Sequence, residues 1–273
     1  SPWVPTIYQD VRGFMWFGTR RGLDRYDGYS IGNYRHVRGD STTLPDNYIE
    51  FVREDRDSVL WVGTRKGLSR FDRAHDRFVT YSVGPGDSGR VVFSFVHTRA
   101  GQRWVGTEEG LYQFDRATGK SVRYARSAAL GLVGKNIVAL AEDRRGHLWI
   151  ATREIGVIDL DPATGAARSY LAVGPDADIR AVLEDDGGTI WVGSYRGGLA
   201  KIDPLSGTVT RYQHDPANPK SLALNAVQTL IENGRTGLWV GLENGGLDRF
   251  DFGTATFTHN NYDPNNPTGL NNN

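Results

Sequence analysis

A short motif centred on tryptophan recurs six times along the chain at nearly constant spacing. Six of the seven tryptophans occupy it, and successive copies lie 45, 43, 45, 42 and 48 residues apart. The copies read MWFGT at 15–19, LWVGT at 60–64, RWVGT at 103–107, LWIAT at 148–152, IWVGS at 190–194 and LWVGL at 238–242. A fixed period of this length is typical of propeller blades with four strands each. The motif therefore predicts an all-β propeller with six four-stranded blades in this chain.

Alignment on the tryptophans predicts the same four strands in every repeat. The first strand ends in an acidic pair in most copies, as at Glu142-Asp143, and a Gly-rich turn leads into the tryptophan strand. A Gly-Leu pair opens the third strand and an Asp closes it, as in 198–203. We expect the acidic pairs to bind turn N–H groups rather than to act as acid–base couples, because they recur in nearly every unit. We expect the repeated tryptophans to be buried between adjacent blades: Trp16, Trp61, Trp104, Trp149, Trp191 and Trp239.

The repeat boundaries predict a single propeller over residues 1–273. The repeats cover 1–45, 46–89, 90–134, 135–177, 178–222 and 223–266, and residues 267–273 resemble the start of a further repeat. Six complete blades could close face to face. A seven-bladed ring would instead need a missing neighbour, and the unmatched tail favours a fragment of a longer protein.

Composition narrows the function classes. Lys plus Arg equals Asp plus Glu at 32 each, so the whole-chain charge gives no reason to expect a nucleic-acid partner. The chain has no cysteine, which excludes disulfides, thiolate zinc sites and a cysteine nucleophile. No apolar run is long enough for a membrane span, so we expect a soluble protein or an excised soluble domain that is not itself membrane-spanning.

The whole pattern resembles the two-component regulator propeller repeat. The resemblance rests on the acidic pair, Leu-Trp-Val-Gly-Thr, Gly-Leu and Arg-Phe-Asp, is closest at 60–72 and 238–251, and extends to the Asp-Pro-rich links at 215–219 and 263–267. It departs mildly at Ala151, Ser194, Leu242 and His97-Thr98. The family builds periplasmic sensor regions of bacterial hybrid two-component systems and of some membrane-bound diguanylate cyclases, commonly as a seven-bladed ring. The resemblance implies a ligand-sensing domain in the periplasmic or extracellular part of a membrane receptor.

A ligand site is expected where the repeats differ most. The turns between second and third strands share one face with the links between blades, and their dipeptides vary while the rest of the unit is regular. A ligand surface would explain this variety; a plain solvated loop face is the alternative. The candidate residues are Arg20, Arg21, Arg65, Lys66, Glu108, Glu109, Arg153, Tyr195, Arg196, Glu243 and Asn244.

The chemistry of these candidates suggests two kinds of ligand contact. Arg20, Arg21, Arg65 and Lys66 could bind a carboxylate or sulfate, since Arg offers paired donors. Tyr195 could stack on a sugar ring. We therefore expect a small-molecule or glycan ligand, with the signal leaving through the rest of the receptor chain or a homodimer interface, because no kinase or cyclase segment is present.

Two other functions remain open at this stage. Streptogramin lyases are also propellers with Trp-rich repeats, and they use His and Glu with a bound magnesium. Here the six histidines fall at scattered repeat positions, which indicates surface groups, and no nucleophile elbow, phosphate loop or dinucleotide fingerprint occurs. We therefore expect no enzymatic activity, no metal and no cofactor. The third class is a protein-interaction platform without a small-molecule ligand.

Overall fold

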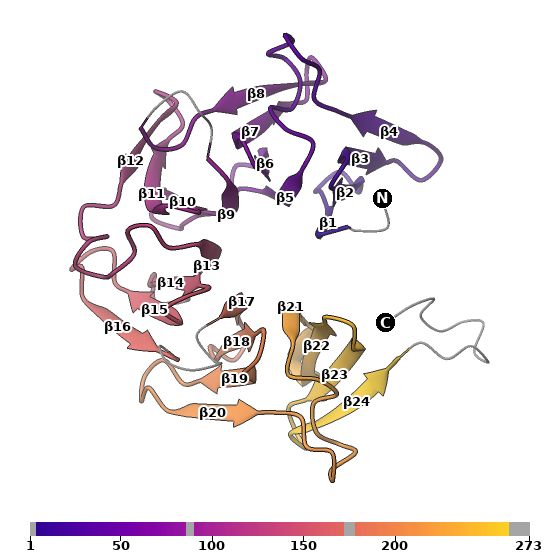
Figure 1. Ribbon diagram of the computed structural model, residues 1–273, viewed down its shortest axis with the longest axis vertical. Coiled ribbons are helices and arrows are strands. Elements are labelled where there is room, and N and C mark those ends of the chain that lie inside the picture. Colours follow the sequence, from indigo (N-terminus) through magenta and orange to yellow (C-terminus); the bar gives the residue numbers. More distant parts are fainter. Residues whose placement is uncertain (1–3, 86–89, 172–177, 262–273) are drawn as a thin grey trace. The chain divides into compact units, whose positions relative to one another are not determined.

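The computed structural model describes residues 4–85, 90–171 and 178–261. Within these residues the chain forms six four-stranded antiparallel sheets, each with its strands in chain order (Figure 1). The described residues contain no α-helix, only a short 3-10 turn at Gly234–Thr236. The predicted all-β propeller with six four-stranded blades is confirmed. The predicted start of a further repeat at 267–273 lies outside the described residues.

Unit 1, residues 1–137, holds the first three blades. Their strands are β1 (Thr6–Gln9), β2 (Met15–Thr19), β3 (Gly22–Tyr26), β4 (Ile31–Tyr34), β5 (Ile49–Glu54), β6 (Leu60–Thr64), β7 (Gly67–Asp72), β8 (Arg77–Tyr81), β9 (Val92–His97), β10 (Arg103–Thr107), β11 (Gly110–Asp115) and β12 (Lys120–Arg123). Strand β5 contacts β1 on one side and β9 on the other, and the second strand of each blade contacts the first strand of the next. Successive blades in this unit therefore pack face to face.

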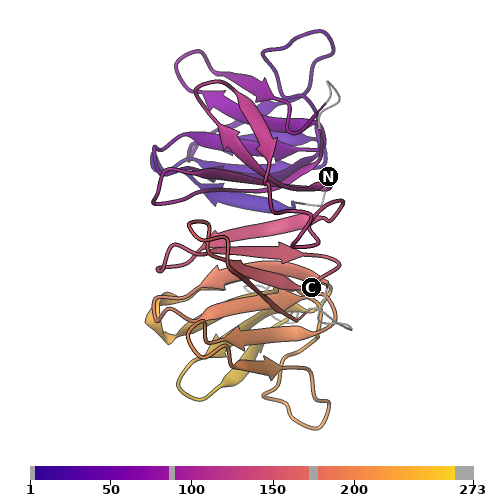
Figure 2. The same cartoon turned by 90° about the vertical axis from the view of Figure 1, so that its left-hand side faces the viewer.

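Unit 2, residues 138–273, holds the last three blades. Their strands are β13 (Ile137–Glu142), β14 (Leu148–Thr152), β15 (Val157–Leu160), β16 (Ala167–Tyr170), β17 (Ile179–Glu184), β18 (Ile190–Ser194), β19 (Gly198–Ile202), β20 (Val209–Tyr212), β21 (Val227–Glu232), β22 (Gly237–Leu242), β23 (Gly246–Asp251) and β24 (Thr256–Asn260). Strand β17 packs against β14 and β21, which repeats the packing of unit 1. Figure 2 shows that the turns within each unit gather at the two ends of the strands.

The repeated tryptophan of one blade packs on aromatic rings of the next. Trp61 has no exposed surface, and its ring stacks on Phe95 of the following blade with centroids 5.1 Å apart. Trp16 and Trp191 also pack on rings of the following blade, and five of the six repeated tryptophans are buried. Trp239 is only half-buried, which corrects the expectation of six equivalent positions. It lies in the last described blade, and no later strand among the described residues covers it.

Glycine after Trp-Val lets neighbouring blades approach closely. A Cβ added to Gly63 would collide with the ring of Phe51 and with the carbonyl oxygen of Val92 in the next blade. The glycine that opens the third strand has a different reason. Gly67 has a φ of +127°, a conformation that L side chains rarely adopt, so the turn before β7 requires glycine.

An aspartate fixes each of four tryptophans from the turn that precedes it. Asp143 Oδ1 accepts the backbone N–H groups of Arg145 at 2.9 Å and His147 at 3.0 Å. Its Oδ2 accepts the indole Nε1–H of Trp149 at 3.0 Å. The same indole bond occurs in the pairs Asp10–Trp16, Asp55–Trp61 and Asp185–Trp191. These four Asp–Trp pairs confirm that the acidic residues stabilise turns.

Guanidinium groups neutralise most of these buried carboxylates. Arg73, from the following blade, donates to Asp10 Oδ2 at 2.9 Å, and Arg145 donates to Asp143 Oδ2 at 2.6 Å. Burial alone would raise the pKa of Asp143. Hydrogen bonds from Trp149, Arg145 and the His147 backbone, with the charge of Arg145, outweigh that effect and lower the pKa below its usual value.

The third repeat lacks the pair because Thr98 replaces the aspartate. The Thr98 hydroxyl oxygen accepts the backbone N–H of Gln102 at 3.1 Å but does not reach the indole. Trp104 Nε1 is buried and has no hydrogen-bond partner among the described residues. Leaving a buried donor unpaired costs about 1–3 kcal/mol, so the third repeat is less stabilised at this position than the four blades with an Asp–Trp pair.

Replacing Trp149 by Ala should lower the free energy of unfolding by about 3–5 kcal/mol, because a fully buried indole leaves a cavity. The same change at half-buried Trp239 should cost less. Urea unfolding followed by circular dichroism measures both. A loss under about 1 kcal/mol at Trp149 would contradict its core position.

Replacing Asp143 by Asn should weaken the acid sensitivity of folding. A carboxylate whose pKa is lowered on folding contributes stability above its unfolded pKa of about 3.9, and that contribution is lost as the pH falls through the folded value. Asp143→Asn should therefore be less stable than the parent at pH 7, by about 1–3 kcal/mol, and the difference should shrink at pH 3. Urea titrations at both pH values test this; an unchanged difference would contradict it.

Candidate functional site

All eleven candidate residues lie in turns between the second and third strands of their blades, as predicted. These turns also lie beside the segment that leads into the first strand. The backbone N–H of Tyr195 donates to Asp178 O and that of Glu243 to Ala226 O, both at 2.9 Å, and Glu108 N–H donates to Val91 O at 3.3 Å. Within each unit, turns and blade links therefore share one end of the strands, which we call the loop face.

An aromatic ring that the repeat pattern did not single out organises the basic end of unit 1. The guanidinium of Arg65 lies 3.7 Å from the ring centroid of Tyr48, and Arg20 Nε donates to the Tyr48 hydroxyl at 3.1 Å. Arg65 Nε also bonds Glu50 at 3.3 Å. Tyr48 thus brings Arg20 and Arg65 together, while Glu50 offsets part of their charge.

The other two basic candidates of unit 1 differ in how far they are engaged. Lys66 Nζ lies 3.9 Å from an oxygen of Asp46, a long ion pair at a side chain that is 62% exposed. Arg21 is exposed, and its guanidinium forms no ion pair among the described residues. Arg21 is therefore the cation of this group with the most capacity for an external anion.

The acidic candidates of the third repeat are engaged within the blade. Glu109 pairs with Arg90 at 3.1 Å and lies 3.8 Å from Arg123. Glu108 accepts the backbone N–H of Val91 at 3.2 Å. These carboxylates order the link into β9, and Arg90 and Arg123 already satisfy Glu109.

In unit 2, Tyr195 is half-buried, and the guanidinium of Arg180 lies 4.8 Å from its ring centroid. Arg196 and Arg153 are exposed in their turns. Glu243 accepts a hydrogen bond from the side-chain amide of Gln228. Asn244 has a φ of +57°, in the left-handed region that asparagine adopts more readily than most residues. The backbone of this turn is therefore enough to explain an asparagine here.

Two blade links use histidine to close a loop. His36 Nδ1 lies 2.8 Å from Leu44 O, and its backbone N–H donates to Asn47 Oδ1 at 2.7 Å. His214 makes the equivalent contacts, to Leu222 O at 2.9 Å and to the Asn225 side chain at 2.7 Å. Both histidines therefore have a structural role.

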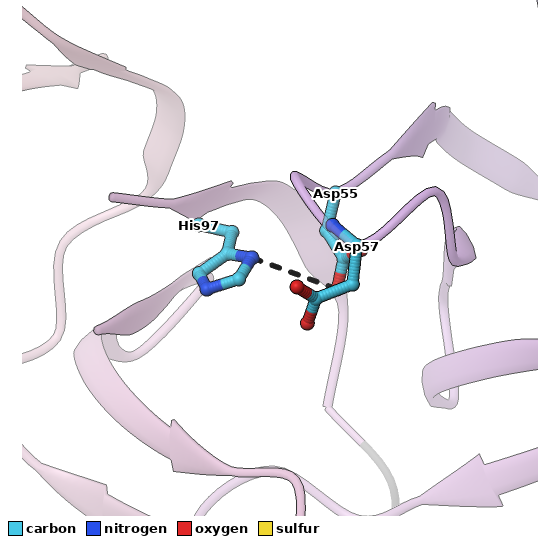
Figure 3. A group of neighbouring side chains, drawn as sticks. All are labelled: Asp55, Asp57 and His97. Atoms are coloured by element: carbon cyan, nitrogen blue, oxygen red, sulfur yellow. Dashed lines mark hydrogen bonds and ion pairs between the residues drawn. The ribbon is translucent and has the colours of Figure 1, made fainter. Parts of the chain in front are cut away.

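At the opposite end of the strands, His97 lies close to Asp55 and Asp57 (Figure 3). Its side chain is 7% exposed, which corrects the prediction that the histidines are surface groups. Nδ1 has no hydrogen-bond partner among the described residues and lies 3.8 Å from Asp55 Oδ2. Burial, reinforced by the charge of Arg103, lowers the pKa of His97, so the imidazole is neutral at pH 7.

Arginines balance the carboxylates of this cluster. Arg103 and Arg116 contact Asp57 Oδ2 at 2.6 and 3.3 Å, and Arg103 Nε lies 3.6 Å from Asp55 Oδ2. Two guanidinium charges already offset two carboxylates and would repel an entering cation. We therefore assign no metal to this cluster.

A second group of Asp143, His147 and Asp159 has the same character. His147 Nδ1 lies 2.7 Å from Asp159 Oδ1, and Arg145 contacts carboxylate oxygens of both aspartates. Arg145 thus occupies the place that a cation would take. Its role is to neutralise the Asp–Trp pair described above.

Comparison with known proteins finds a family model that matches part of the chain. The model of the two-component regulator propeller matches residues 131–154 and 174–196, which include the tryptophan strands β14 and β18. No curated protein matches the sequence. Among the described residues we find no helix with the length and apolarity that a membrane crossing requires.

Solved structures extend the likeness over nearly the whole chain. The extracellular domain of a protein described as a hybrid two-component system of B. thetaiotaomicron aligns with a TM-score of 0.82 and 26% identity, over 99% of this chain and 36% of that one. The extracellular domain of a one-component system of the same organism gives 0.78 and 22%, over 94% and 36%. The chain thus spans about a third of the length of these domains.

An enzyme shares the fold at lower similarity. Virginiamycin B lyase from Staphylococcus aureus aligns with a TM-score of 0.72 and 13% identity, over 93% of this chain and 83% of the lyase. At this identity the likeness shows the fold alone. The family model thus bears out the resemblance to the two-component regulator propeller in two of the six registered repeats.

Proposed function

We propose that the chain is the ligand-sensing propeller of a bacterial signal-transduction receptor and lies in the periplasmic or extracellular part of that receptor. The observation that carries the proposal is the loop face, where an otherwise regular unit presents different side chains in every blade. The alignment with extracellular domains of one- and two-component systems supports the same function.

The loop face of unit 1 suits an anionic ligand. Arg21 is exposed, and Arg20 and Arg65 both contact Tyr48, so several guanidinium donors lie within one small area. Guanidinium groups bind carboxylate and sulfate with paired hydrogen bonds. Such groups occur on small organic acids and on acidic glycans, which we propose as the ligand classes.

The signal would leave through an interface. The chain carries no kinase or cyclase motif, so the propeller must act on the rest of the receptor chain or on a second copy in a homodimer. A ligand shifts such an interface only by its different affinity for the two arrangements. The proposed mechanism is therefore a ligand-dependent change in how this propeller packs on its neighbour.

A thermal-shift screen of glycans and small organic acids tests the proposal. A ligand that binds the folded state raises the melting temperature, and above the Kd the added stability grows with the logarithm of the ligand concentration. Concentration-dependent stabilisation confined to one chemical class supports the sensor. A chain that instead captures only another protein, with no small-molecule response, would support an interaction platform.

Replacing Arg21 and Arg65 together by Ala should weaken the identified anionic ligand by about 1.5–3 kcal/mol for each charged hydrogen bond lost. Arg21→Ala alone should account for more of the loss than Arg65→Ala, because Arg65 is already paired with Glu50. Calorimetric titration measures both, with Arg168→Ala in β16 of the other unit, an exposed arginine outside the loop face, as a matched control. Unchanged affinity in the double variant would place the site elsewhere.

The purified chain should not open a cyclic lactone in the presence of magnesium. The histidines near carboxylates are held by aspartates and arginines rather than presented in the loop face. Incubation with a streptogramin B and mass analysis of the product tests this. Magnesium-dependent ring opening would replace the sensor proposal with a lyase.

A further inference from the structure

Among the described residues, Asp185 is the one aspartate of the four Asp–Trp pairs whose carboxylate forms no ion pair with an arginine; the nearby Arg144 donates instead to its backbone carbonyl oxygen at 3.0 Å. Its Oδ1 accepts the backbone N–H of Thr189 at 2.9 Å and its Oδ2 accepts the indole of Trp191 at 2.7 Å. In the other pairs an arginine lies 2.6 to 3.6 Å from the equivalent oxygen: Arg73 at Asp10, Arg103 at Asp55 and Arg145 at Asp143. Asp185 itself is only 6% exposed.

The sequence shows why the cation is missing. The third strand and the residue after it read GLSRFDR in the second blade and GLDRFDF in the sixth. Phe252 therefore stands at the repeat position of Arg73, whose guanidinium bonds Asp10 of the preceding blade. Phe252 stacks on Trp191 with centroids 5.4 Å apart and an interplanar angle of 8°. An aromatic ring has taken the place of the guanidinium.

This exchange leaves a cleft between blades five and six of unit 2. The cleft has a volume of about 440 Å³ and is lined by Asp185, Trp191, Tyr212, Phe250 and Phe252 among others. Phe252 and Tyr212 are half-buried, so their rings contribute exposed aromatic surface. A buried carboxylate above aromatic rings is a favourable environment for an organic cation.

The rim of the cleft carries one cation, Lys201, whose charge acts on Asp203 without a direct ion pair among the described residues. Lys201 Nζ lies 5.9 Å from the ring centroid of Trp191 and forms no ion pair among the described residues. The other charged groups of the rim are engaged within the protein. Glu232 accepts the backbone N–H of Asp186 at 2.8 Å, and Arg235 Nε lies 3.6 Å from the Asp186 carboxylate.

We propose that this cleft binds a ligand that carries a guanidinium group and an anionic group. The guanidinium bonds Asp185 and stacks on Phe252, which reproduces from outside the contact that Arg73 makes with Asp10. The anionic group pairs with Lys201. The cleft lies at the end of the strands opposite the loop face, so this site is independent of the proposed sensor function.

Two probes of nearly equal shape test the charge requirement. Nα-acetyl-L-arginine has both groups, whereas Nα-acetyl-L-citrulline replaces the guanidinium by a neutral urea. Isothermal titration of the whole chain should give saturable binding of the arginine probe and at least about tenfold weaker binding of the citrulline probe, because an ionic hydrogen bond at a buried carboxylate is lost.

Two variants locate the site. Asp185→Asn should remove the preference for the arginine probe. Phe252→Arg should supply the missing guanidinium from the chain itself and weaken the arginine probe at least about tenfold, while the melting temperature does not fall. Asp76→Asn, a carboxylate-to-amide change at an exposed position of unit 1, should leave the affinity unchanged. Circular dichroism confirms that each variant is folded.

Three results would overturn the proposal. They are equal affinity for the two probes, no saturable binding of either probe, and parent-like binding by the folded Phe252→Arg variant. If Asp185→Asn fails to fold, the Phe252→Arg variant still tests the proposal, because it retains the Asp–Trp pair.

Discussion

The hydrogen bond between a turn aspartate and a buried indole is the interaction on which the blades depend. It ties the turn between the first two strands to a tryptophan that packs on the next blade. One carboxylate therefore links the local turn, the sheet and the contact between sheets. The cost is a buried negative charge in each of the four blades that have the pair. At Asp10 and Asp143 an arginine offsets that charge, and it comes from the following blade in one case and from the same turn in the other.

The need for this hydrogen bond also makes the two ends of each blade differ in how freely their side chains can vary. At the end with the Asp–Trp pairs, the turn side chains form structural hydrogen bonds. Because this pattern is so regular, a repeat that departs from it is informative. Thr98 leaves an indole unpaired, and Phe252 leaves a carboxylate without its cation. The opposite end has no such requirement. Its turns need only the positive φ of the glycine that follows, so their side chains can differ from blade to blade and serve recognition.

Sequence alone could predict the blades, because the tryptophan period reports strand order and burial together. The turns of the loop face were predictable for the same reason. The partners of the candidate residues were not, since Tyr48 and Glu50 reach Arg65 from a link whose length and composition vary between repeats. The burial of His97 was also missed, because it replaces a glutamate at a position where charged residues recur. The aligned repeats show that Phe252 occupies the position of Arg73. The consequence could be inferred only from the structure, in which this position lies near the aspartate of the preceding blade.

The most direct test of the Asp–Trp pair measures the hydrogen-exchange rates and chemical shifts of the indole Nε1–H protons. Both are read from nitrogen–proton correlation spectra of the labelled chain. The account predicts slow exchange and downfield shifts for the Nε1–H protons of Trp16, Trp61, Trp149 and Trp191, which are bonded to carboxylates. Trp104, which is equally buried but unpaired, should resonate upfield of these four. A Trp104 signal that coincides with the other four, or four paired indoles that exchange as fast as Trp239, would contradict it.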